Sequence, residues 1–201
     1  MNKRVMGTMF TLVLVALMAL APVAQGKTEW KQEFDVEPGQ KIELNMPSGG
    51  SLEVEGWDRD VVRIVCTEGV NDLDDYTFDV DETRAGLRFF ADVEDRHIQS
   101  TGLLVKLMVP REFDIETNSG GGHISIANVT GDFRGETAGG HINLESVSGT
   151  ADLHTKGGIV RIKDADLDGK VTTDGGGGLV RAVTGNVVTT SGGSIVSYEN
   201  V

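Results

Sequence analysis

Three aspartates at alternate positions form the sharpest chemical motif in this chain. They are Asp164, Asp166 and Asp168, and Gly169 follows them. This spacing resembles the first half of a calcium-binding loop, where alternate carboxylates surround the ion and a glycine makes the bend. The twelfth position would be Gly175 instead of a bidentate glutamate, and no flanking helix is expected, so an EF-hand is excluded. Two interpretations remain, a solvated acidic turn and a weak calcium site.

Two histidines fall at equivalent places in successive repeats. His123 and His141 are 18 residues apart, each beside a glycine. Their rings are expected to point outward next to each other, where they either share a metal or simply stack. The third repeat has Ile159 at this place, so a third ring nitrogen is missing. Arg161 and Arg181 are likewise expected to lie side by side, either to bind an anion or to offset the acidic surface.

Catalytic motifs are not found among the remaining reactive residues. No serine stands in a Gly-x-Ser-x-Gly elbow. Cys66, the only cysteine, alternates with Val62 and Ile64, which predicts a buried and inert thiol. Carboxylates on one outer face could serve a glycan-processing enzyme, and this alternative stays open. The favoured prediction is a protein without enzymatic activity.

Glycine-punctuated repeats in residues 111–201 must position all of these side chains. Similar segments begin at Gly122, Gly140 and Gly158, at steps of 18 residues. The next begins at Gly178 after 20 residues, and the last at Gly193 after 15. A second glycine recurs inside each unit, so one unit reads as strand, glycine turn, strand and Gly-Gly turn.

Stacking is the physical solution for such units, because none is large enough to bury its own apolar face. The repeats predict an all-β fold, a β-solenoid-like stack of coils of about 18 residues. Ile124, Ile142, Val160 and Val180 are expected to form one interior row, with neighbouring coils about 4.8 Å apart. The alternative is an antiparallel meander with coincidental Gly-Gly turns. The step of 20 coincides with the three aspartates, which are therefore expected in a bulged corner loop.

Short alternating strands are predicted for residues 27–110. Strands are expected at 61–66, 76–80, 87–91 and 103–109, and the last is apolar on nearly both faces and therefore interior. We expect this region to be antiparallel and to share the stack of the repeats, so that 27–201 forms one continuous domain.

Residues 1–26 have the features of a secretory signal. Lys3 and Arg4 precede an apolar run over 9–20, Pro22 follows, and 24–26 ends in small residues. An uncleaved anchor is the alternative, but the run is short for a bilayer span of about 20 residues. We therefore predict an exported protein of the periplasm or cell surface without stable membrane insertion after cleavage. Its net charge of −13 disfavours nucleic acid and anionic lipid as partners.

The segments 34–39, 49–57 and 109–110, together with the Gly-Gly coils, carry a family resemblance. The chain resembles the bacterial putative-adhesin family of unknown function, which consists of exported cell-envelope proteins, and the resemblance runs from residue 34 to residue 201. It implies a β-solenoid-like fold, an envelope or surface location, and an adhesive or stress-related role. It brings no catalytic residue and no cofactor.

The sequence thus predicts a non-enzymatic binding or scaffold module whose partner is an envelope protein or a glycan. A calcium-dependent envelope-stress component and a glycan-processing β-helical enzyme are the alternatives. The last strand is expected to expose unpaired backbone groups that could take another strand, which predicts end-to-end self-association. The residues expected at this edge are Ser194, Val196, Tyr198 and Val201.

Overall fold

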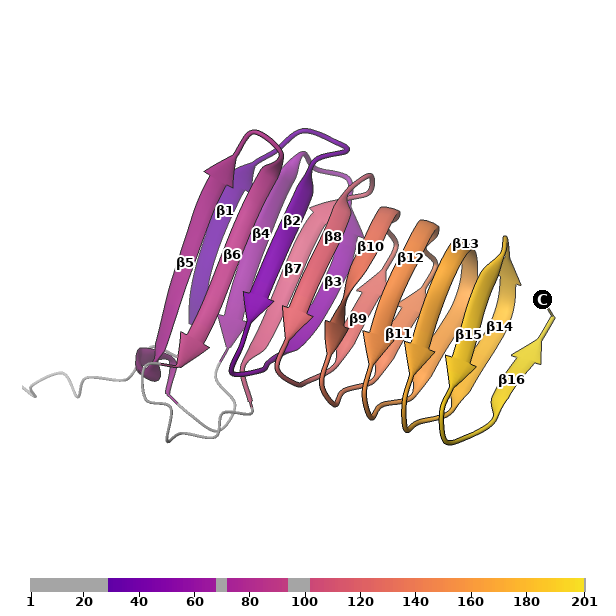
Figure 1. The fold of residues 1–201 in the computed structure, drawn as a ribbon. Helices are drawn as coiled ribbons and strands as arrows, with labels where there is room; N and C mark the ends of the chain where they lie inside the picture. The colour runs from indigo at the N-terminus through magenta and orange to yellow at the C-terminus, as the bar shows by residue number, and fades with distance from the viewer. Residues whose placement is uncertain (1–28, 68–71, 94–101, 201) are drawn as a thin grey trace, which may run out of the picture.

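One sheet contains all the strands of the described protein. The computed structural model describes residues 29–67, 72–93 and 102–200. The sheet has 16 strands, mixes parallel and antiparallel pairs, and curls strongly, so that two layers face each other (Figure 1). The all-β prediction is confirmed, whereas the predicted signal at 1–26 lies outside the described residues. No helix in the described ranges combines the length and apolar character needed to cross a membrane.

The strands are short and follow one another closely along the chain. A 3₁₀ helix, η1 (Leu73–Asp75), precedes β5. The strands are β1 Glu29–Asp35, β2 Lys41–Met46, β3 Ser51–Trp57, β4 Val61–Thr67, β5 Tyr76–Thr83, β6 Gly86–Val93, β7 Leu104–Pro110, β8 Asp114–Ser119, β9 Ile124–Ala127, β10 Thr130–Thr137, β11 Ile142–Glu145, β12 Ser148–Thr155, β13 Val160–Thr173, β14 Gly178–Thr184, β15 Val187–Ser191 and β16 Val196–Glu199.

Parallel pairs in the repeat region join residues 18 positions apart without interruption. Ile142 lies between Ile124 and Val160. Gly178 then lies beside Val160, and Val196 beside Gly178. The predicted step of 18 is confirmed for the first repeats, but the predicted steps of 20 and 15 are wrong. Whether these repeats constitute a β-solenoid stays a prediction.

The error has a physical cause in the tract of glycines at 175–178. Consecutive glycines offer several alignments, and the sequence pattern favours Gly178 as the start of the unit. In the structure Gly176 occupies the place of Gly158, because a Cβ on Gly176 would collide with the Gly158 carbonyl oxygen. Val180 consequently lies beside Ile162 and not beside Val160. The three aspartates lie in or along β13, and no bulged loop of extra length is present there.

One left-handed residue turns each repeat between its two strands. These residues recur every 18 positions and have φ between 50° and 58°. Asparagine and aspartate tolerate this conformation better than other residues with a Cβ, whereas alanine does not. The residues are Asn128, Ser146, Asp164, Ala182 and Asn200.

The predicted antiparallel arrangement of residues 27–110 is only partly correct. β2 runs parallel to β6 and β8, and β3 runs parallel to β7 and β9. Antiparallel pairing is confined to β1–β4–β7 and β5–β6. The reason is that β2 and β3 meet at a Gly-Gly corner like those of the repeats. Gly50 N–H donates to the Gly121 carbonyl at 2.9 Å, which sets the two corners in register.

The core lies between the two layers. Phe89, Phe113 and Phe133 are its largest fully buried side chains. Cys66 is 0% exposed, and burial raises the pKa of its thiol to about 12. The prediction of a buried thiol is therefore confirmed, and the raised pKa keeps the sulfur protonated and unreactive.

Buried hydroxyls hold the Gly-Gly corners, a feature that the sequence pattern did not suggest to us. Thr137, Thr155 and Thr173 lie in one interior row at intervals of 18 residues. Each hydroxyl donates to the glycine carbonyl 15 positions earlier, at 2.8, 2.6 and 2.6 Å. Such a bond stabilises the fold by about 1 kcal/mol, and losing one side of it costs more.

Candidate functional site

A row of side chains crosses the outer surface of one layer at a constant register. We call it the polar row. It runs over six neighbouring strands in the order β6, β2, β8, β10, β12 and β13. Its members are Phe90, Asn45, Asn118, Glu136, His154 and Thr172, which lie side by side as register partners.

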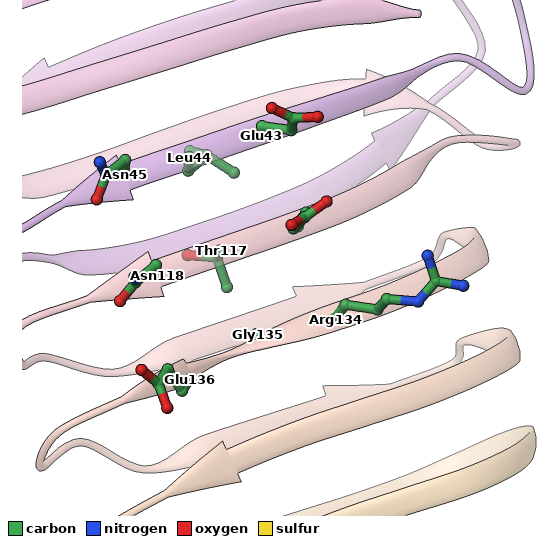
Figure 2. A pocket seen from close by; sticks show the side chains of 9 residues that line it. Glu43, Leu44, Asn45, Thr117, Asn118, Arg134, Gly135 and Glu136 are labelled. Atoms are coloured by element: carbon green, nitrogen blue, oxygen red, sulfur yellow. The ribbon is translucent and has the colours of Figure 1, made fainter.

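The central members of the polar row have unused hydrogen-bonding capacity. Figure 2 shows Asn45, Asn118 and Glu136 beside one another on adjacent strands. All three are exposed, and within the described part of the chain none forms a hydrogen bond or an ion pair. His154 differs, because its Nδ1 lies 2.9 Å from Thr172 Oγ1 and its Nε2 lies 3.4 Å from Asp174 Oδ2.

Charged side chains two residues earlier on the same strands satisfy one another. Arg88 Nε donates to Glu43 Oε2 at 2.9 Å, and Lys41 also pairs with Glu43. Lys41 Nζ lies 3.5 Å from Glu116 Oε2 as well. Hydrogen bonds from Lys41 and Arg88 hold the pKa of Glu43 below its usual range. These charges are therefore committed within the sheet, unlike the three central groups of the polar row.

A shallow hollow of about 340 Å³ lies over these strands. It forms where Gly135 (φ 145°) brings β10 close to β8, since a Cβ at Gly135 would collide with the Thr117 carbonyl oxygen. The residues that line it are Glu43, Leu44, Asn45, Glu116, Thr117, Asn118, Arg134, Gly135 and Glu136.

The chemistry of the hollow suits a ligand with many hydroxyl groups. The two carboxamides can each donate and accept, and the Glu136 carboxylate can only accept. A hydroxyl group both donates and accepts, so neighbouring hydroxyls match this set. The side chains repeat at the strand spacing of about 4.8 Å. Phe90, half-buried at one end of the row, adds an apolar ring.

The three aspartates of the sequence motif lie on the outer face without converging. Asp164 is at a left-handed corner beside Lys163 Nζ, at 3.2 Å. Asp166 Oδ1 accepts from Thr184 Oγ1 at 2.8 Å, and Asp168 Oδ1 accepts from the Asn186 backbone N–H at 2.8 Å. No group of three or more potential metal ligands comes together among the described residues. The calcium site stays a prediction, which a change of melting temperature on adding EDTA would test.

His123 and His141 lie side by side as expected. Their ring centroids are 4.8 Å apart and the rings are nearly parallel, at 19°. Each Nδ1 accepts a backbone N–H from the next repeat, from His141 at 2.9 Å and from Ile159 at 2.8 Å. A neutral ring that accepts at Nδ1 carries its proton on Nε2. Neither ring then offers a free lone pair, so stacking is favoured over a shared metal.

The expected pairing of Arg161 with Arg181 is wrong, because it depended on the step of 20. Leu179 lies beside Arg161, and Arg181 lies beside Lys163. Lys163 Nζ is 2.6 Å from Glu145 Oε1, so an acidic neighbour already offsets this cation.

The predicted self-association residues lie at the β15–β16 end of the sheet. Ser194 is exposed, Val196 is half-buried and Tyr198 is 50% exposed. Tyr198 hydroxyl donates to the Thr189 carbonyl at 3.0 Å. Val201 lies outside the described residues.

Part of the polar row has a signal in the sequence that the glycine pattern obscured. Asn118, Glu136, His154 and Thr172 recur at intervals of 18 residues. Following polar residues at this interval, as well as glycines, would have found them. Asn45 and Phe90 lie outside the repeats, and only the pairing of β2 with β6 and β8 adds them.

Several solved structures have folds that resemble this one. A "putative cell adhesion protein" from Clostridium sporogenes is 12% identical, with a TM-score of 0.34, over 85% of this chain and 99% of that chain. A "putative adhesin" from Parabacteroides distasonis is 14% identical (TM-score 0.31, 88% and 98% covered). A "putative lipid binding protein" from the same species is 13% identical (0.30, 87% and 98%).

Two of these three descriptions name the adhesin class that the sequence resembles. No protein-family model matches the chain, and no curated protein matches it. The function is therefore argued from the chain's own residues.

Proposed function

We propose that this protein is an exported, non-enzymatic binding module of the cell envelope that holds an extended glycan along the polar row. The observation that carries the proposal is the unused hydrogen-bonding capacity of Asn45, Asn118 and Glu136 in an exposed, hollowed row. We further infer that the stacked repeats form a β-solenoid, whose constant register keeps these groups in line.

A polymer fits this row better than a small ligand. The hollow is shallow, and its neighbours continue the row over six strands, which corresponds to roughly 24 Å at the usual strand spacing. Many weak contacts over such a length can sum to useful affinity, although each hydrogen bond contributes only about 1 kcal/mol. A neutral chain is favoured over an anionic one, because Glu136 would repel an acidic ligand and the whole protein has a net charge of −13.

Glycan cleavage is less well supported than glycan binding. A glycosidase needs one carboxylic acid with a raised pKa as its proton donor. The acidic group of the hollow whose pKa departs from its usual value is Glu43, and ion pairing with Lys41 and Arg88 lowers it. This carboxylate therefore stays ionised and is unsuited to donate a proton.

Titration of the protein with neutral β-linked glucan oligosaccharides of increasing length, followed calorimetrically, tests the proposal. We expect affinity to rise with length until the row is covered and then to level off. The double variant Asn118→Ala/Glu136→Ala should weaken binding roughly tenfold or more, since two hydrogen bonds are lost.

Asn143→Ala/Glu145→Ala is the matched control, because it removes the same residue types from the outer surface of the opposite layer. It should leave the affinity unchanged. Absence of binding at every oligosaccharide length, or equal losses in both double variants, would contradict a glycan site on the polar row.

A further inference from the structure

The β15–β16 end of the sheet has two strands that are paired on one side only. Within the described residues, β15 pairs with β13 alone and β16 pairs with β14 alone. Figure 1 shows them at the yellow end of the fold, one in each layer. Their free edges present backbone N–H and C=O groups that another strand can pair with.

Exposed apolar side chains gather at this same end. Among the described residues, the large hydrophobic side chains that are exposed all belong to β14, β15, β16 or the turn before β16. They are Leu179 (38%), Val188 (54%), Ile195 (82%) and Tyr198 (50%). The buried Thr189 Oγ1 in β15 has no hydrogen-bond partner in the described structure. Contact with another chain would cover this apolar surface.

The opposite end of the sheet is closed and charged. Trp30 of β1 stacks on Phe78 of β5 with ring centroids 5.1 Å apart, which joins the two layers there. The outward positions of β1 include Lys31, Glu33 and Asp35. Charges on an edge strand discourage pairing with another chain. By contrast, β15 has no charged residue.

We propose that two copies of this chain associate through their β15–β16 ends and form a closed dimer. Head-to-tail filaments are disfavoured, because the β1–β5 end offers no matching uncharged edge. A two-fold axis across the junction reverses the direction of the second copy, so the joined strands pair antiparallel. The uncharged edge allows this contact between two molecules that are each acidic overall. The dimer does not depend on glycan binding, since the polar row lies on an outer face.

Light scattering coupled to size-exclusion chromatography tests the dimer over a range of concentrations. We expect a mass that rises to twice that of the chain and stays there. The double variant Val188→Lys/Ile195→Lys, which places two charges at the proposed junction, should remain monomeric. Gln32→Lys on β1 is the matched control at the opposite edge and should still dimerise.

A monomer at all concentrations would overturn the proposal, including the case in which further residues of a longer chain cover this end. Unlimited growth in mass would overturn the closed arrangement. If the lysine variant fails to fold, hydrogen exchange of the unmodified protein decides the question. Amides of β15 and β16 should be protected at high concentration and lose at least tenfold protection on dilution, and unchanged protection would contradict the dimer.

Discussion

The Nδ1 atom of His123 accepts a hydrogen bond from the backbone N–H of His141 at 2.9 Å. His141 in turn accepts from Ile159, so two imidazoles link three successive repeats at their corners. These bonds require an unprotonated Nδ1. Protonation of either ring would replace an acceptor by a donor and break the link.

The stability of the fold should therefore decrease in mild acid. Burial, the neighbouring His123 and Arg161 hold the pKa of His141 below its ordinary value. The unfolded chain then binds a proton more readily than the folded one, so this contribution is present above about pH 6.5 and is lost as the pH falls through the folded pKa.

Urea unfolding at about pH 7.5 and about pH 5 measures this loss. The decrease in midpoint should be smaller in His141→Gln than in the unmodified protein. His154→Gln, on the other layer, should not reduce it. An equal decrease in the unmodified protein and His141→Gln would show that the linked imidazoles contribute nothing.

Replacing Thr155 by valine should reveal the strength of the buried hydroxyl row. The Thr155 hydroxyl donates to the Gly140 carbonyl and accepts from the Gly158 N–H at 3.2 Å. Thr155→Val leaves both groups buried without a partner, which should lower the free energy of unfolding by about 1–3 kcal/mol.

Thr117→Val is the matched control, because Thr117 Oγ1 is buried without a hydrogen-bond partner among the described residues. Removing that hydroxyl should be neutral or stabilising. Similar losses for both variants in chemical denaturation would argue against a specific role of the hydroxyl at the Gly-Gly corner.

The corner at Ala182 should be improvable. Ala182 has φ 50°, a conformation in which Asn128 and Asn200 stand at equivalent corners. Ala182→Asn should raise the free energy of unfolding by about 0.5–1 kcal/mol, since a left-handed alanine is strained. Ala127→Asn, one residue before a corner, should bring no gain. A stability difference of zero between these variants would contradict the strain.

Sequence periodicity predicted which residues face the core but not all of their partners. Ile124 and Ile142 could be aligned because a Gly-Gly pair precedes each of them. Val160 and Val180 were misaligned because glycines at 175–178 carry no side chain that distinguishes one position from the next. Only the backbone packing against Gly158 selects Gly176 as its equivalent.

The candidate site was harder to predict, because it combines distant parts of the chain. Alternation along β2 indicates that Asn45 faces outward, but it does not tell which strand lies next to it. Pairing with β8 places Asn118 there, and this depends on the corner contact between Gly50 and Gly121. The aspartate motif was conspicuous in sequence, yet extended backbone separates its carboxylates along β13.

An uninterrupted register of 18 residues underlies the rows, the corners and the proposed glycan site, and paired cysteines test it directly. In a Cys66→Ala background, Lys163→Cys/Arg181→Cys places thiols on register partners about 4.8 Å apart, within reach of a disulfide. Arg161→Cys/Arg181→Cys, the pair that a step of 20 would align, lies on a diagonal of about 8 Å. Mild oxidation, read by mass spectrometry of the intact chain, should form the disulfide readily in the first variant and not in the second. Disulfide formation in the second variant alone would contradict the register.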